Sequence, residues 1–187
     1  MADISVKYMG LELGSPIIAA SSGLTAQINR IKEFEEAGVG AVVVKSLFEE
    51  QISNEAEFLS TQSQLYPESA DYLHYYLRQN SIARYLELVT NIKAAVKIPV
   101  IASINCYSGG EWTSFAKEIE GVGADGLELN IYSLPLNIHK SSDTIEQEYL
   151  DVVKEVSSLI KIPVAVKIAS TFTNLPAFVN GLKAHGA

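Results

Sequence analysis

The sequence contains very few residues of the kinds that bind metals or form disulfides. A single cysteine, Cys106, occurs among 187 residues. One thiol excludes a framework of intrachain disulfides and a thiolate-rich metal site. The three histidines lie far apart, at positions 74, 139 and 185, without the spacing of metal ligands. We therefore predict a protein that holds no metal ion.

Long apolar runs and positive charge are also scarce. No stretch of about eighteen apolar residues occurs, as a transmembrane helix would require. The formal net charge of −8 argues against nucleic-acid binding, which needs a clustered basic surface. The opening Met1-Ala2-Asp3-Ile4 lacks the basic and apolar regions of a secretion signal. We expect a soluble, cytoplasmic protein that binds neither membrane nor nucleic acid.

What the chain does contain is a regular alternation of short apolar runs with segments of helical periodicity. Strands are predicted over residues 16–20, 41–46, 99–104, 126–130 and 163–168, and helices over 28–37, 82–96, 111–120, 144–160 and 176–184. This alternation is typical of parallel βαβ units. Residues 5–8 and 11–13, on either side of Met9-Gly10, predict a small β-hairpin before the main fold.

Two internal repeats support a barrel. Lys97-Ile98-Pro99-Val100 recurs as Lys161-Ile162-Pro163-Val164, and Gly38-Val39-Gly40-Ala41 recurs as Gly121-Val122-Gly123-Ala124. Repeated joints between helix and strand are what a TIM (β/α)8 barrel needs. A complete barrel has eight units and about 250 residues, whereas about five units are present here. We therefore expect residues 1–187 to form one (β/α) barrel domain that is incomplete at its C-terminus.

Residues 47–79 form a long mixed stretch between the second strand and the next helix. Tyr72, Tyr75 and Tyr76 lie near its end. Loops of this length inside compact domains are commonly functional lids. The tyrosines predict an ordered lid or, as an alternative, aromatic packing onto the rim of the barrel.

Polar groups follow the predicted strands at their carboxyl ends. Lys45-Ser46, Asn130 and Lys167 each end an apolar run. These ends converge on one mouth in a parallel barrel. A lysine that emerges from a buried strand is costly unless an anionic group meets it, so the pattern predicts an electron-rich ligand. The alternative for Lys45 is a rim lysine paired with Glu49 or Glu50.

The same segments resemble a known family. Asp125-Gly126-Leu127-Glu128-Leu129-Asn130-Ile131, followed by a hydroxyl-bearing loop, is similar to the fourth-strand signature of the dihydroorotate dehydrogenases. The turn from Pro16 to Gly23, Lys45-Ser46 and Val166-Lys167 match other motifs of that family, in the same order. The resemblance covers essentially the whole chain.

The resemblance implies an FMN-binding enzyme of pyrimidine biosynthesis, an oxidoreductase that converts dihydroorotate or a related dihydropyrimidine and forms a homodimer. It implies that Lys45 and Asn130 also contact the substrate. The cofactor-binding residues that it implies are Ala20, Ser21, Ser22, Lys45, Ser46, Asn130 and Lys167. The end of the third strand lies at the same mouth, so we expect Ser103 or Asn105 to contact the flavin as well. Elements that grip the substrate in the family are less well matched, since Leu134-Pro135 replaces the expected Pro-Asn.

Ser133 falls where the family places its catalytic base. Serine needs a proton relay in this role, because an unaided hydroxyl is a poor base. The alternative is an ordinary loop serine. Cys106, after the third strand, is either a nucleophile or base, or a small buried apolar residue. Two other functions stay open: a phosphate-binding barrel enzyme without flavin, and an inert paralogue or interaction module.

Overall fold

The computed structural model describes residues 3–48, 67–105, 109–132 and 136–187, with the side chains of 67–78 and 109–111 left aside. Its main sheet is parallel, with strand order β3-β4-β6-β7-β8, and β5 also pairs with β6. The strands are β3 (Ile18–Ala19), β4 (Ala41–Val43), β5 (Leu47–Phe48), β6 (Val100–Asn105), β7 (Gly126–Asn130) and β8 (Val164–Lys167). The predicted parallel α/β architecture is confirmed.

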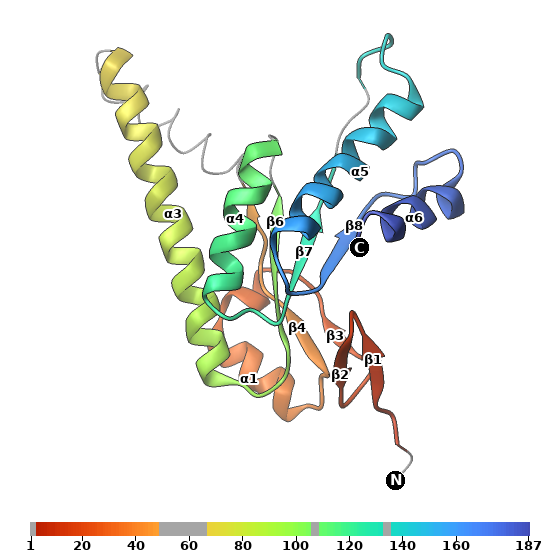
Figure 1. Cartoon of the computed structure of the whole chain (residues 1–187). Coiled ribbons are helices and arrows are strands. Elements are labelled where there is room, and N and C mark those ends of the chain that lie inside the picture. The colour runs from red at the N-terminus through yellow and green to blue at the C-terminus, as the bar shows by residue number, and fades with distance from the viewer. Residues whose placement is uncertain (1–2, 49–66, 106–108, 133–135) are drawn as a thin grey trace.

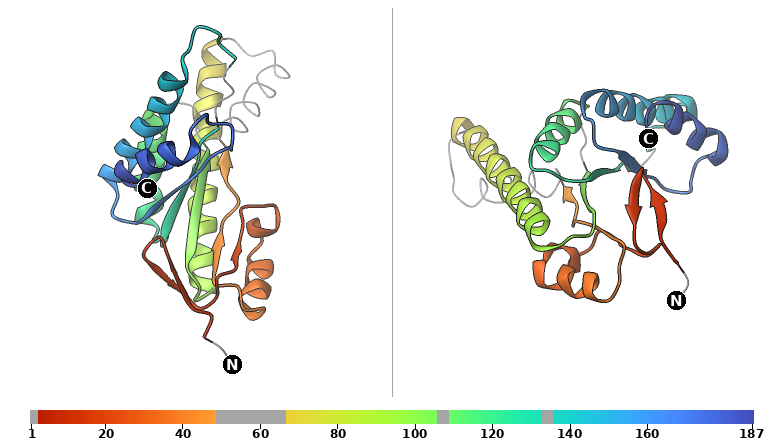
Figure 2. Two further views of the ribbon diagram at one scale, coloured as in Figure 1. Left: turned by 90° about the vertical axis from the view of Figure 1, so that its right-hand side faces the viewer. Right: turned by 60° about the horizontal axis from the view of Figure 1, so that its bottom comes forward.

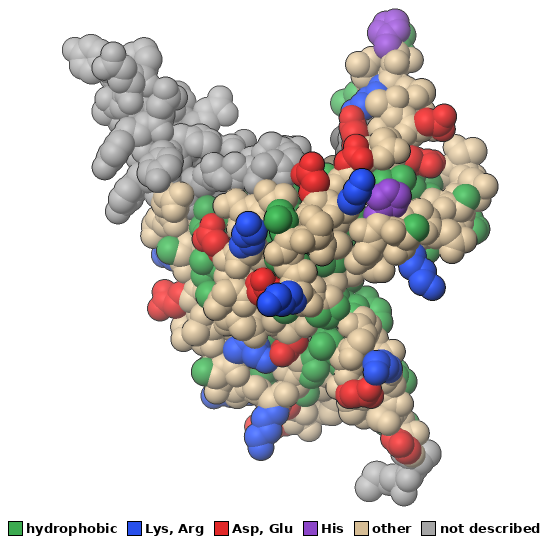
Figure 3. All heavy atoms as spheres, viewed as in Figure 1, with side chains coloured by type: hydrophobic (Ala, Val, Ile, Leu, Met, Phe, Trp, Pro, Cys, Tyr) green, Lys and Arg blue, Asp and Glu red, His purple; other side chains and the backbone are tan. Residues whose placement is uncertain are grey.

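Helices cover the convex face of this curled sheet (Figures 1 and 2). They are the short 3-10 helix η1 (Leu24–Ala26) and α1 (Ile28–Glu36), α3 (Pro67–Ala95), α4 (Gly109–Gly121), α5 (Ser142–Leu159) and α6 (Leu175–Ala184). Strands β1 (Val6–Tyr8) and β2 (Leu11–Leu13) pair antiparallel and lie on the other side of the sheet. Opposite charges are interspersed over the helical face that Figure 3 shows.

The sheet separates two apolar cores, because alternate residues of a strand point to opposite faces. The larger core joins the strands to the helices and includes Val42, Ala102 and Leu129. The smaller core lies on the inner face. There Ala41, Val43 and Ile101 pack with Leu13 and Met9 of the hairpin segment. The hairpin therefore covers the inner face near the amino ends of the strands.

The structure differs from the sequence prediction in the stretch after β4. Helix α3 begins at Pro67, so the expectation of a loop as far as residue 79 is wrong for its last part. Proline is favoured in the first turn of a helix, and the predicted start at residue 82 lies inside α3. The unpredicted strand β5 adds a third parallel partner to β6, beside β4 and β7. Residues 49–66, the rest of the predicted lid, lie outside the described residues.

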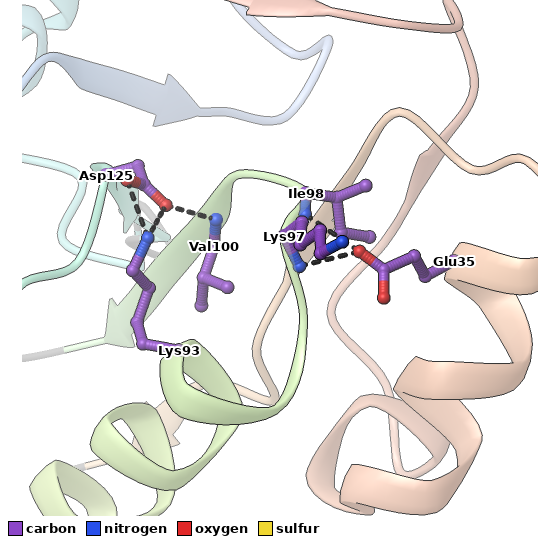
Figure 4. A network of polar contacts seen from close by, with 6 residues as sticks. All are labelled: Glu35, Lys93, Lys97, Ile98, Val100 and Asp125. Carbon is purple, nitrogen blue, oxygen red and sulfur yellow. Dashed lines mark hydrogen bonds and ion pairs between the residues drawn. The ribbon is translucent and has the colours of Figure 1, made fainter.

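Carboxylates fasten the joints at the amino ends of the strands (Figure 4). Glu35 of α1 accepts hydrogen bonds from the backbone N–H groups of Lys97 and Ile98, at 2.6 and 3.0 Å. Glu120 of α4 accepts from Lys161 and Ile162 in the same way, at 2.5 and 3.3 Å. The two copies of the Lys-Ile-Pro-Val repeat are therefore held by equivalent contacts.

A third carboxylate joins a helix to a strand at the same end of the sheet. Asp125 accepts from the Lys93 ammonium at 2.6 Å and from the Val100 N–H at 2.7 Å (Figure 4). Contacts at the amino end of a barrel usually serve stability, since the chemistry lies at the opposite end.

The glycine repeat is not equivalent position by position. Gly38 and Gly123 adopt positive φ, at 88° and 83°, whereas Gly121 is the last residue of helix α4. Gly38 and Gly123 each stand three residues before the first residue of a strand, β4 and β7. A left-handed residue just after a helix favours glycine, which has no Cβ to clash. By backbone conformation Gly38 therefore corresponds to Gly123. The sequence repeat instead aligns Gly38 with Gly121, two residues earlier.

Candidate active site

The inner face of the sheet changes from apolar to polar toward the carboxyl ends of the strands. Ile101 and the glycine at 126 lie in the apolar part, where Met9 approaches. Two residues further along β6 and β7 come Ser103 and Glu128, which are register partners. Strand alternation then places Asn105 and Asn130 on the same face. The sequence thus builds a polar layer above an apolar floor.

A chain of hydrogen bonds runs through this layer across four segments. The Ser21 hydroxyl, after β3, lies 3.0 Å from the Ser46 hydroxyl and accepts the Ser46 backbone N–H at 2.9 Å. The Ser46 and Ser103 hydroxyls are 2.7 Å apart. Ser103 donates to Glu128 Oε1 at 2.8 Å. Ser46 and Ser103 are buried, whereas Ser21 and Glu128 are half-buried.

Tyr85 of α3 lies on the opposite side of the sheet and fixes the backbone of Ser103, a member of this series of hydrogen bonds. Its hydroxyl donates to the Ser103 carbonyl and accepts the Ser103 N–H, both at 2.8 Å. The Ser103 backbone groups face the interval between β4 and β5, where strand pairing is interrupted. Burial raises the pKa of Tyr85, the hydrogen bond from the Ser103 backbone opposes this, and the nearby Glu128 charge raises the pKa further. The phenol therefore stays protonated and serves as donor and acceptor together.

Two ammonium groups belong to the same end of the sheet. Lys45 is half-buried, and within the described part of the chain no hydrogen bond or ion pair is present for its side chain. Lys167 is exposed and is the register partner of Asn130 between β7 and β8. Asn105 donates its side-chain N–H to the Asn130 carbonyl at 2.9 Å. Cationic and amide donors thus frame the polar layer.

The structure brings together three of the predicted site residues by direct contact, Ser21, Ser46 and Ser103. Asn130 and Lys167 are adjacent across two strands. Ala20 and Ser22 are exposed after β3, and the Ser22 backbone bonds with the Thr25 hydroxyl in both directions. The predicted base Ser133, the alternative Cys106 and the proposed Lys45 partners Glu49 and Glu50 lie outside the described residues.

Sequence reasoning missed Glu128 and Tyr85 as members of the site. Glu128 was detectable, because it stands two residues before Asn130 on one strand and therefore shares its face. Tyr85 gave no such signal, since it lies on a helix behind the sheet.

The described residues contain neither a cluster of metal ligands nor a helix that could span a membrane. No group of three or more histidine, cysteine, aspartate or glutamate side chains there could hold a metal ion. None of the described helices combines the length and apolar character needed to cross a membrane.

No protein-family model matches the chain, but several curated proteins are similar to it in sequence. The catalytic subunit of dihydroorotate dehydrogenase B (NAD(+)) from Thermoplasma volcanium is 30% identical over 181 residues, covering 94% of this chain and 57% of that protein. The same subunit from Thermoplasma acidophilum is 25% identical over 182 residues, covering 94% and 57%. The Geobacillus sp. subunit is 25% identical over 192 residues, covering 100% and 59%. The chain thus spans somewhat more than half the length of these relatives.

Solved structures with lower sequence identity share the fold. A proposed dihydrodipicolinate synthetase from Pseudomonas aeruginosa has a TM-score of 0.52 at 16% identity, over 89% of this chain and 51% of that one. A dihydrodipicolinate synthase from Aquifex aeolicus has a TM-score of 0.50 at 16% identity, over 84% and 46%. At such identity the likeness concerns the fold alone, a curled half-barrel of the TIM type.

Proposed function

The chain is a relative of the dihydroorotate dehydrogenases, and we propose that it acts as an FMN-dependent oxidoreductase on dihydroorotate or a related dihydropyrimidine. The relatives confirm the family resemblance inferred from the strand-end motifs. The substrate, the cofactor and the reaction belong to the proposal. So do a homodimeric assembly and a cytoplasmic location.

One observation carries the proposal: a polar layer with two lysines stands at the carboxyl end of an otherwise apolar inner face. Lys45 is half-buried without a partner among the described residues, and Lys167 lies beside Asn130. An uncompensated, half-buried ammonium favours an anionic or electron-rich ligand. The donor set therefore fits a flavin, which is rich in carbonyl and ring-nitrogen acceptors.

When bound, FMN would supply a hydride acceptor, and the chain's own residues would bind and polarise it. Lys45, Asn130 and Lys167 would hold the ligand from the strand ends, with Ser21 and Ser22 alongside. Ser46 is buried behind Ser21 and would support it by hydrogen bonds. The Lys167 ammonium would stabilise negative charge that develops on the ligand during reduction, as fixed charges do in other active sites. Ser133, three residues after Asn130, is the proposed proton-abstracting group.

The first test uses the protein isolated from its natural source. We expect flavin absorbance, and bleaching of that absorbance when dihydroorotate is added without oxygen. Ser133→Ala should slow the bleaching by roughly a hundred- to ten-thousandfold, the usual effect of losing a general base. A colourless protein that takes up no FMN would overturn the proposal. It would favour the phosphate-binding barrel or the inert module.

The second test compares two lysines at opposite ends of the sheet. Lys167→Met should lower the flavin reduction potential, because the ammonium favours the more negative reduced form. The matched control is Lys161→Met, whose exposed side chain lies at the amino end. Equal potentials for Lys167→Met and wild type would contradict the assigned role.

A further inference from the structure

The hydrogen-bond chain from Ser21 to Glu128 has a determined direction. An ionised carboxylate can only accept hydrogen bonds, and a serine hydroxyl has one proton to donate. Ser103 gives its proton to Glu128 Oε1. The proton in the 2.7 Å contact between Ser46 and Ser103 must therefore come from Ser46. The same reasoning makes Ser21 the donor in its 3.0 Å contact with Ser46.

This direction decides what Ser21 can offer a ligand. Its proton is committed to Ser46, and one of its acceptor sites takes the Ser46 backbone N–H at 2.9 Å. A hydroxyl oxygen has two acceptor sites, so one remains. Ser21 is half-buried at the carboxyl end of β3, and among the described residues only Ser46 bonds to its hydroxyl. Ser21 thus presents an acceptor and no donor.

Ser46 and Ser103, in the middle of the series of hydrogen bonds, are buried, and this burial stabilises the donor direction from Ser21 to Glu128. Ser103 is 0% exposed and Ser46 is 5% exposed, so water cannot readily supply alternative partners. Tyr85 fixes the Ser103 backbone by two further hydrogen bonds. Hydrogen bonds in such surroundings polarise one another along a chain. The Glu128 carboxylate at one end therefore sets the orientation of the Ser21 hydroxyl at the other end.

We propose that Glu128 is a positioning residue that, acting through Ser103 and Ser46, fixes Ser21 as a hydrogen-bond acceptor for an N–H group of the bound ligand. The part that concerns a flavin ligand rests on the proposed function, whereas the direction of the chain does not. Without a carboxylate at position 128, as in Glu128→Met, every hydroxyl could turn round, and Ser21 would gain a donor. The Glu128 side chain thus determines whether Ser21 offers the ligand an acceptor or a donor.

Neutron diffraction on the deuterated chain near neutral pD tests the direction without any ligand. We expect the Ser21 deuteron between Ser21 and Ser46, the Ser46 deuteron toward Ser103, and the Ser103 deuteron toward Glu128. Any of the three pointing the other way overturns the inference, whatever the protein binds. If the deuterons lie as expected but FMN does not bind, the proposed function fails and the inference on direction stands.

A double-mutant cycle on FMN binding tests the effect on the ligand. Glu128→Met and Ser21→Ala should each weaken FMN about tenfold, and the double variant should be no weaker than either single one, because both act through one acceptor. Sites without a shared interaction give additive effects, so additive losses would contradict the proposal. Ser114→Ala, which alters an exposed serine bonded to Glu118 at 3.4 Å, is the matched control and should bind normally.

Discussion

Removing a single oxygen atom from Tyr85 tests whether its hydroxyl stabilises β6 at Ser103. There the gap between β4 and β5 interrupts the strand pairing. In Tyr85→Phe, the Ser103 N–H and carbonyl each lose a partner at 2.8 Å. Each buried polar group left unsatisfied costs about 1–3 kcal/mol. Ser103 is 0% exposed, and the space of one hydroxyl oxygen is tight for a water molecule. We therefore expect a loss of about 2–6 kcal/mol in the free energy of unfolding.

Urea unfolding followed by circular dichroism measures this loss. The midpoint should fall while the dependence of the free energy on urea stays unchanged, because the surface exposed on unfolding is nearly the same. Tyr132→Phe is the matched control, since Tyr132 is 59% exposed and should change stability by less than about 0.5 kcal/mol. If Tyr85→Phe unfolds at the wild-type midpoint, the two hydrogen bonds do not stabilise the strand as argued.

The alkaline behaviour of the same pair of proteins provides an independent check. Burial raises the pKa of Tyr85 in the folded state above the ordinary value of about 10 for a tyrosine. Above about pH 10 the unfolded phenol loses its proton while the folded one keeps it, so the unfolded state gains stability. Wild type should lose up to about 1.4 kcal/mol more per pH unit there than Tyr85→Phe. Parallel stability curves for the two proteins between pH 9 and 11 would refute the assignment.

The remaining predictions concern the amino-end joints. Gly123→Ala should lower the free energy of unfolding by about 1–2 kcal/mol, because its φ is 83°, whereas the helical Gly121→Ala should raise it by roughly 0.5–1 kcal/mol. Thermal unfolding distinguishes them, and equal shifts would contradict the displaced repeat. Glu120→Ala should cost about 1–3 kcal/mol, because two backbone N–H groups lose their acceptor, while the exposed Glu118→Ala should cost almost nothing. Similar melting of both variants would argue against a role for this carboxylate.

Much of the fold was predictable because its strands are short apolar runs that end in polar residues. β7 is predicted with its observed bounds, and Lys45, Asn130 and Lys167 were identified from their positions at strand ends. The start of α3 was not predictable, because the stretch before residue 82 mixes polar, charged and aromatic residues. The short β5 has too few residues for any periodicity to show.

The site could be predicted only where its members lie on neighbouring strands. Strand alternation places Ser103 and Asn130 on one face. The contact between Ser21 and Ser46 joins residues 25 positions apart and depends on how β3 and β4 end. The contribution of Tyr85 depends on tertiary packing across the sheet, which no local pattern encodes.

The Tyr85 hydroxyl also ties an outer helix to the backbone of strand β6. The residues from Tyr85 to Ser103 form a closed loop whose two ends are joined by hydrogen bonds. An insertion or deletion in this loop would have to break the tie or displace Ser103. The part of α3 before Tyr85 is outside that loop, so its length can change without altering the spacing. Natural variation in chain length should therefore accumulate before Tyr85 and be rare between Tyr85 and Ser103.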